Sequence, residues 1–307
     1  MVASRKTRRE QQFESARRIA MESGGAFIDP GVLFGRASND DLENYSPEML
    51  AVSAVRAAAD LAAWNGEAPR ITIEAVDDVA PNGVPVSILS IVDHNKAFLY
   101  DSLMGEVTSL YRDITMAIHP ILSVAPGGDV SLSVPEQEPG GAIRVSYMQI
   151  HLAPLSAEQA RSLEENLAGV LARVKMASTD WKPMLSLLDA AMQELSTTVA
   201  GRRKSDRDEA LAFLDWLRKD NFTFLGMREY IYSGEGADAK VERSLGQGLG
   251  ILSDPDVLVL RQGKHAVTTT PEILAFLQGP DFLIVTKANV KSVVHRRAYM
   301  DYVGVKR

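Results

Sequence analysis

Hydrophobic residues recur every three or four positions over long stretches of the chain, which is the spacing of a buried helix face. The clearest stretch follows Ser46-Pro47, a typical helix cap and first helical residue, and predicts a helix over 47–64. The same spacing predicts helices over 98–112, 157–176 and 181–195. Each of these helices therefore has one apolar stripe to bury against a neighbour.

Apolar runs of strand length alternate with the predicted helices, and they cover 71–76, 86–92, 116–122 and 143–152. From residue 86 onward the order is strand, helix, strand, hairpin, strand, helix, which is typical of a ferredoxin-like βαββαβ plan in the α+β class. That plan needs one more edge strand, which 71–76 or a segment outside this chain could supply. His119-Pro120 removes a backbone donor and predicts a sheet edge or a bulge.

A second, smaller domain is predicted after the hydrophilic break Gly201-Arg202-Arg203-Lys204. The aromatic run 222–232 predicts a strand, with a hairpin partner at 240–245. Further apolar runs occupy 282–285 and 299–305. We therefore expect three parts, which are a weakly structured or helical extension over 1–40, a ferredoxin-like domain with flanking helices over 41–200, and a second small α+β domain over 205–307.

Composition excludes several classes of function. The chain has 307 residues, of which 46% are hydrophobic and 24% charged, as expected for about two globular domains. The net charge of -7 argues against nucleic acid or an anionic membrane as a partner, and no apolar run reaches the ~18 residues of a membrane span. The absence of cysteine excludes disulfides, thiolate metal ligands and thiol catalysis.

No catalytic or metal site can be recognised from residue spacing. Gly246, Gly248 and Gly250 form G-x-G-x-G, which lacks the spacing and the following helix of a dinucleotide-binding loop, so we expect a turn or a β-bulge. The five histidines include no pair four residues apart, and neither a P-loop nor a nucleophile elbow occurs. We therefore predict no catalytic residue, no metal and no cofactor on this chain.

Two clusters remain as candidate binding sites. The first lies between a buried strand and a helix start, where free amides and the helix dipole favour an anion such as the carboxylate of an effector. Its residues are His94, Asn95, Lys96, Asp101 and Ser102. An ordinary connecting loop is the alternative interpretation of this segment.

The second cluster lies in the final stretch, Asp281–Arg307, as candidate contacts with another domain or with an anion. Its residues are Lys287, Asn289, Lys291, His295 and Arg296. A solvated strand edge is the alternative. Because the chain ends inside a strand-like run, we expect a longer protein and a second domain truncated at its C-terminal end. Asp281–Arg307 should pack on residues 205–280 or on a second copy of the chain.

Several motifs resemble, in order, those of the large NAD-specific glutamate dehydrogenases of bacteria. In the first predicted domain they are Ser46–Leu50 (SPEML), Phe98–Ser102 (FLYDS) and Ile118–Pro120 (IHP). In the second they are Asn221–Tyr230 (NFTFLGMREY), Gly248–Leu252 (GLGIL), Val285–Asn289 (VTKAN) and Tyr299–Arg307 (YMDYVGVKR). The resemblance runs from about residue 40 to the end, and the order of the motifs makes it specific.

The resemblance implies a non-catalytic N-terminal region that serves regulation and oligomerisation. In that family this half holds ACT-like domains, which are ferredoxin-like, and a PAS-like domain, while the dehydrogenase domain that binds NAD lies downstream. The parent would be a cytoplasmic homo-oligomer that converts L-glutamate, NAD and water to 2-oxoglutarate, ammonia and NADH. The implied partners are the downstream domain, further copies and an amino-acid effector, with neither nucleic acid nor membrane.

One segment departs from the pattern of the resemblance. ACT domains that bind amino acids often carry D-x-P-G-x-L after the first strand, whereas the aligned residues here are Asn95 to Leu99, without proline or glycine. Phe98 would occupy the space that such a ligand needs. An ACT-like fold used for subunit contacts is therefore expected. The alternative function is a free-standing ACT-like amino-acid sensor or interaction module.

Overall fold

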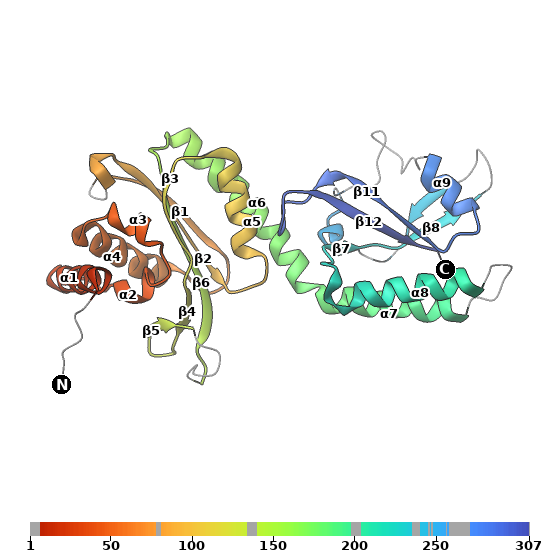
Figure 1. Ribbon diagram of the computed structural model, residues 1–307, viewed down its shortest axis with the longest axis horizontal. Coiled ribbons are helices and arrows are strands. Elements are labelled where there is room, and N and C mark those ends of the chain that lie inside the picture. The colour runs from red at the N-terminus through yellow and green to blue at the C-terminus, as the bar shows by residue number, and fades with distance from the viewer. Residues whose placement is uncertain are drawn as a thin grey trace. The chain divides into compact units, whose positions relative to one another are not determined.

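The computed structural model describes residues 7–77, 81–133, 140–197, 204–234, 240–244, 246, 248–255, 257 and 271–306. The chain divides into two units, residues 1–171 and 172–307, which are described separately here (Figure 1). Both combine helices with antiparallel strands, so the predicted α+β class is confirmed.

The first unit is organised around an antiparallel sheet. Its described strands are β1 (Arg70–Val76), β2 (Val86–His94), β3 (Ile114–Ile118), β4 (Ile121–Val124), β5 (Val130–Leu132) and β6 (Ile143–Leu152). They lie in the order β1-β2-β6-β4-β5, and β3 also pairs with β6. β2 and β6 pair from Ser87↔Leu152 to His94↔Val145 and are buried over most of their length.

Two predictions about this sheet are confirmed. β1 pairs with β2 from Arg70↔Val92 to Val76↔Val86, so it supplies the edge strand that the plan required. The strand expected over 116–122 is divided at His119-Pro120 into β3 and β4, which bond to β6 in one register, so the pair forms no bulge. It follows β3, which pairs only with β6 among the described strands, so the predicted edge position is confirmed. At the interruption the Pro120 carbonyl accepts a hydrogen bond from the Tyr147 N–H at 3.2 Å.

Helices cover both faces of the sheet (Figure 1). On one face lie α5 (Leu99–Leu110) and α6 (Ala157–Thr179). On the other lie α1 (Arg8–Glu22), α2 (Pro30–Leu33), α3 (Asn39–Glu43) and α4 (Pro47–Ala63). Buried residues of α1 and α4, including Phe13 and Leu50, share a core with Val92 and Tyr147 of the sheet. The extension predicted as weakly structured or helical is therefore helical from Arg8 onward and part of this core.

The second unit is a helix pair faced by short antiparallel strand pairs. Its helices are α7 (Trp181–Thr197), α8 (Lys204–Trp216), the π-turn η3 (Leu217–Asn221), the 3-10 turn η5 (Ile251–Ser253) and α9 (Pro271–Gln278). Its strand pairs are β7 (Gly226–Met227) with β10 (Leu249–Gly250), β8 (Tyr230–Ser233) with β9 (Lys240–Arg243), and β11 (Leu283–Lys291) with β12 (Tyr299–Val305). The single strand expected over 222–232 is thus divided between two strand pairs.

The division between the units differs from the boundary expected at 200–205. It falls at 171/172, inside α6. The physical reason is the apolar stripe of α7: Leu188 and Leu195 are buried against Ala210 and Leu214 of α8. Phe282 joins the same core, which confirms that the stretch after residue 281 packs on residues within 205–280.

Candidate functional sites

At the junction between β2 and α5, the predicted anion site is occupied by the chain's own charges. Asp93 is buried at the end of β2. The Lys96 ammonium lies 2.7 Å from Asp93 Oδ2, and the His94 N–H donates to Asp93 Oδ1 at 2.7 Å. Because a buried ion pair is satisfied internally, the positive charge of Lys96 is already balanced.

The other predicted residues of this junction also contact the chain. His94 Nε2 lies 2.7 Å from the Gly66 carbonyl oxygen, and the Ser102 hydroxyl donates to the Phe98 carbonyl at 2.5 Å. The Asn95 N–H donates to the Arg144 carbonyl at 3.0 Å, while Asp101 is exposed in the first turn of α5. The structure therefore gathers these residues around one helix start, and effector binding there stays a prediction.

Phe98 itself adopts a left-handed backbone conformation, with φ of 67°. Glycine is the residue that enters this region without steric cost, and a bulky side chain there is uncommon. The chain therefore places a bulky, half-buried ring at a position whose backbone conformation favours glycine.

A chain of buried polar side chains crosses the other face of the sheet. The Tyr45 hydroxyl lies 2.8 Å from His151 Nδ1, and His151 Nε2 lies 3.2 Å from Gln149 Oε1. The Gln149 amide donates to the Tyr147 hydroxyl at 3.1 Å, which donates to Asp60 Oδ2 at 3.3 Å. Since an amide oxygen only accepts, the proton of the imidazole is on Nε2, and every bond in the series points toward Asp60.

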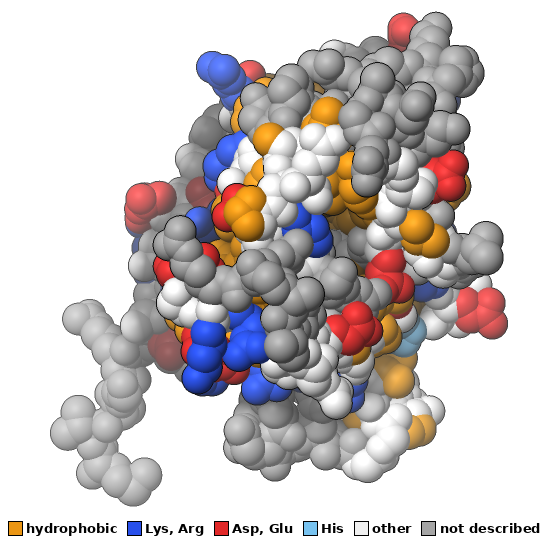
Figure 2. Space-filling view, turned by 90° about the vertical axis from the view of Figure 1, so that its right-hand side faces the viewer, with side chains coloured by type: hydrophobic (Ala, Val, Ile, Leu, Met, Phe, Trp, Pro, Cys, Tyr) orange, Lys and Arg blue, Asp and Glu red, His pale blue; other side chains and the backbone are white. Residues whose placement is uncertain are grey.

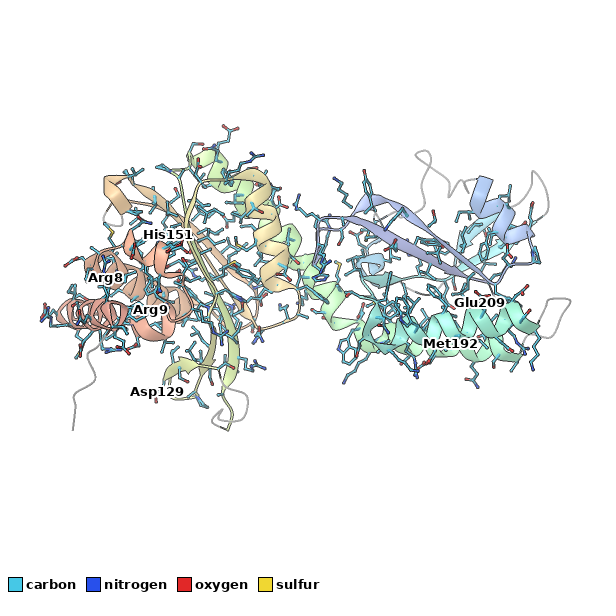
Figure 3. All side chains as sticks on the ribbon, in the orientation of Figure 1. Arg8, Arg9, Asp129, His151, Met192 and Glu209 are labelled. Carbon is cyan, nitrogen blue, oxygen red and sulfur yellow. The ribbon has the colours of Figure 1, made fainter. Side chains whose placement is uncertain are left out.

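Burial sets the protonation states in this series. Desolvation lowers the pKa of His151 to about 3 and raises the pKa of Tyr45 to about 12. Desolvation and the nearby Asp60 charge both raise the pKa of Tyr147. His151 lies between the sheet and the helices of the first unit (Figure 3). The only sequence signal for this feature was the set of polar residues at alternate positions of β6.

His119, a half-buried histidine between β3 and β4, makes a second contact of this kind. Its Nε2 lies 2.6 Å from the Ser146 hydroxyl, and its ring stacks on Tyr100 with centroids 4.8 Å apart. Desolvation, helped by the charge of Arg36, lowers the pKa of His119 to about 4. His119, Tyr100 and Arg36 also line a hollow of about 240 Å³.

The candidate residues near the C-terminal end of the sequence lie on the β11–β12 hairpin. Lys287 Nζ lies 2.5 Å from Asp301 Oδ1 across the hairpin, and Lys291 Nζ lies 5.4 Å from the centroid of the Tyr299 ring. His295 and Arg296 follow in the connecting turn, where His295 has φ of 67°. Asn289 stands at the irregular register between Lys287 and Lys291. Contact of these residues with another domain stays a prediction.

The glycine run that could suggest a nucleotide site is used for close packing. At Gly250 the backbone has φ of 59°, and an added Cβ would overlap the Leu225 carbonyl oxygen. The Gly250 N–H donates to Asp180 Oδ2 at 2.8 Å. A Cβ at Gly248 would likewise overlap the Leu252 carbonyl. Two of the three glycines are therefore needed where β10 meets β7 and η5, as the expected turn or bulge requires.

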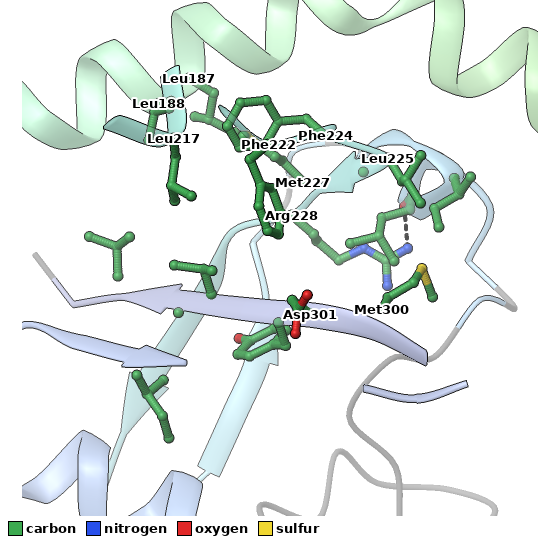
Figure 4. Close-up of a pocket in the computed structure, with 18 of the residues that line it drawn as sticks. Leu187, Leu188, Leu217, Phe222, Phe224, Leu225, Met227, Arg228, Met300 and Asp301 are labelled. Atoms are coloured by element: carbon green, nitrogen blue, oxygen red, sulfur yellow. Dashed lines mark hydrogen bonds between the residues drawn. The ribbon is translucent and has the colours of Figure 1, made fainter. Parts of the chain in front are cut away.

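A cavity of about 740 Å³ lies within the second unit. Figure 4 shows it between α7 and β12, with Phe222, Phe224 and Met227 on one side and Met300 and Asp301 on the other. Arg228 extends along it, and one of its terminal nitrogens donates to the Leu252 carbonyl. Sequence reasoning missed this cavity, because its walls come from segments as far apart as 187 and 306.

Two kinds of feature are absent from the described residues. In the described part of the chain no group of three or more acidic or histidine side chains is placed to hold a metal ion. Within the same ranges, none of the helices has the length and apolar character to cross a membrane. On the face of the second unit drawn in Figure 2, basic and acidic side chains both occur.

Comparisons with known proteins find similarity that includes most of the first unit. Residues 31–167 match the family described as "Glutamate dehydrogenase, ACT1 domain". The chain is 29% identical over 241 residues to the NAD-specific glutamate dehydrogenase of Halomonas elongata, which is 72% of this chain and 14% of that protein. It is 28% identical over 221 residues to the NAD-specific glutamate dehydrogenase of Pseudomonas aeruginosa, covering 68% of this chain and 13% of that protein.

The matched segment is thus a small part of either relative. Residues 31–167, which match the family, include the strands of the first unit's sheet and the helices α3, α4 and α5. The chain is thus similar to bacterial NAD-specific glutamate dehydrogenases over about 70% of its length, and residues 31–167 match the ACT1-domain family of glutamate dehydrogenase.

Proposed function

We propose that the chain is the non-catalytic N-terminal region of an NAD-dependent glutamate dehydrogenase and serves its regulation and oligomerisation. The observation that carries the proposal is the ACT1 match, which coincides with a sheet covered by helices on both faces. The parent reaction would convert L-glutamate, NAD and water to 2-oxoglutarate, ammonia and NADH. Both the catalytic residues and the NAD site would then lie outside residues 1–307.

The chemistry of the described residues supports a non-catalytic role for this region. The polar groups at the β2–α5 junction contact the chain itself, and the buried series from Tyr45 to Asp60 is closed by its own hydrogen bonds. Gly248 and Gly250 make close backbone contacts, so they do not form a phosphate-binding loop. These features stabilise a scaffold, and none of them presents a nucleophile beside a base.

We assign residues 172–307 to the PAS-like domain that the resemblance implies. The support is a helix pair facing antiparallel strand pairs around a partly open cavity. The proposed setting is a cytoplasmic homo-oligomer whose regulatory region contacts the downstream dehydrogenase domain of the same polypeptide and responds to a small-molecule effector. The acidic net charge of -7 is consistent with the absence of a nucleic-acid or membrane partner.

The proposal is tested by assaying the purified 307-residue chain for glutamate-dependent formation of NADH. No turnover is expected, and turnover would refute the claim that catalysis lies elsewhere. Sedimentation of the same chain tests its role in assembly: self-association is expected, and a monomer at every concentration would contradict that part. The alternative function, a free-standing amino-acid sensor, has weaker support because Lys96 and Ser102 are engaged by Asp93 and Phe98.

A further inference from the structure

The cavity of the second unit has the size and walls of a small-molecule site. Its volume of about 740 Å³ falls within the roughly 300–1,000 Å³ of typical ligand pockets. Apolar side chains form most of its surface, among them Phe222, Phe224, Ile273 and Phe276. Such walls favour an apolar ligand body, so the polar groups among them determine which head group is accepted.

Arg228 supplies a positive charge that the described residues leave unbalanced. Its Nη2 donates to the carbonyl oxygens of Leu252 and, at 3.0 Å, Asp254. Its Nη1 is buried and has no hydrogen-bond partner among the described residues. Both acceptors are neutral carbonyls, and a guanidinium stays protonated in proteins. A buried cationic N–H without a partner is costly, and an anionic ligand group would satisfy it.

The position of this guanidinium is fixed by the backbone around it. Arg228 follows β7, whose pairing with β10 leaves no room for a side chain at Gly226 or Gly250. A Cβ at Gly248 would lie 3.0 Å from Arg228 Nε, so the backbone there packs directly on the side chain. A charged group held this way needs little reorganisation when a ligand arrives, which favours binding.

Two other cations line the cavity: Lys306, whose ammonium donates to three carbonyls at the end of α9, and Arg296, which is exposed. Asp301 is paired with Lys287 at 2.5 Å. Tyr302 has a pKa raised to about 12 by burial, so its phenol is neutral and can donate a hydrogen bond. Because Arg228 has one buried N–H group left to offer among the described residues, it suits a singly charged carboxylate better than a phosphate, whose two charges need more donors.

We propose that this cavity binds a small carboxylate with an apolar body, whose carboxylate pairs with Arg228 and whose body lies among the phenylalanine side chains. The inference goes beyond the proposed function. It concerns only residues 187–306 and stands whether or not the chain regulates a dehydrogenase.

Methionine methyl signals provide a direct readout. Met227 and Met300 line the cavity, whereas Met116 and Met148 are buried in the first unit. The 307-residue chain with labelled methionine methyl groups is titrated with 3-phenylpropionate and, in parallel, with hexanoate, leucine and phenylalanine. We expect at least one of these to shift the Met227 and Met300 signals saturably while those of Met116 and Met148 stay in place. Tighter binding of the amino acids would show that the ligand's ammonium is also recognised.

Two comparisons test the role of the charge. The neutral analogue 3-phenylpropanamide should bind about tenfold more weakly than 3-phenylpropionate, which corresponds to about 1.4 kcal/mol. Arg228→Gln should weaken carboxylate binding by a similar factor. The control Arg218→Gln removes a guanidinium paired with Asp189 at 3.1 Å, outside the cavity, and should leave binding unchanged.

Three results would overturn the inference. One is the absence of a saturable Met227 or Met300 shift with all four carboxylates at millimolar concentration. Another is equal affinity for the acid and the amide, and the third is unchanged affinity in a folded Arg228→Gln variant. If that variant does not fold, the comparison of acid with amide on the unaltered chain decides. If glutamate-dependent turnover were found in the chain, the proposed function would fail while these results remained valid.

Discussion

Acidification should destabilise the first unit through the buried His151 and the half-buried His119. The pKa is lowered to about 3 at His151 and to about 4 at His119, mainly by burial in both cases. The unfolded chain, with histidine pKa values near 6.5, therefore binds protons first as the pH falls, so stability is lost below about pH 6.5. From about pH 7 to about pH 5 the loss is roughly 2 kcal/mol for each histidine, or about 4 kcal/mol together.

Tryptophan fluorescence can follow the unfolding of this unit alone. Trp64 belongs to the first unit, while Trp181 and Trp216 belong to the second and are about half exposed. Replacing the latter two with phenylalanine leaves one reporter at little structural cost. Denaturant titrations of this background between about pH 7 and about pH 4 then give the free energy of unfolding at each pH.

A variant separates the histidine contribution from general acid effects. His151→Gln keeps a polar side chain beside Tyr45 but cannot titrate, so the slope of stability with pH should fall by about half. An unchanged slope in His151→Gln would refute the argument that burial of a neutral imidazole causes the acid sensitivity.

Two predictions concern the second unit, with Trp181 and Trp216 as natural reporters of denaturant unfolding. Gly250→Ala should lower the free energy of unfolding by about 2–4 kcal/mol, because φ is positive and the Leu225 carbonyl blocks a Cβ. Gly246→Ala should be nearly neutral, because an added Cβ would have no atom within 4 Å. Equal effects of the two substitutions would contradict the packing argument. Lys306→Met should lower the free energy of unfolding by about 2–3 kcal/mol, because it removes charged hydrogen bonds to three carbonyls at the end of α9. Lys287→Met, which removes the exposed ion pair with Asp301, should lower it by less than about 1 kcal/mol. A larger loss at Lys287 would disprove this ranking.

Local signals in the sequence predicted the first unit well. Helix α4 begins at Pro47 after the Ser46 cap, as the capping residue indicated. Strand β1 takes the edge position that the ferredoxin-like plan left open, and the proline at position 120 marks the break between β3 and β4. Cap chemistry and strand alternation act over a few residues, so a single sequence is enough to predict them.

Features that depend on contacts between distant residues were not predicted. The stripe of Leu188 and Leu195 indicates a buried helix face but does not say which neighbour buries it. Because that neighbour is α8, the units divide at 171/172 and not at the expected 200–205. In the sequence, Arg228 cannot be distinguished from any other basic residue beside a strand. Only the folded structure places the carbonyls of Leu252 and Asp254 against its guanidinium. In the predicted cluster, His94 contacts the carbonyl of Gly66, which is distant in the sequence, and Lys96 forms an ion pair with Asp93.

The most direct test of the central claim compares glutamate-dependent NADH formation in three proteins. They are the 307-residue chain, the NAD-specific glutamate dehydrogenase of Pseudomonas aeruginosa, and that enzyme without the segment similar to this chain. We predict no turnover by the chain, and we predict that the shortened enzyme keeps dehydrogenase chemistry but changes in assembly or in its response to glutamate. Turnover by the chain alone would contradict the account, as would a shortened enzyme with unaltered assembly and kinetics.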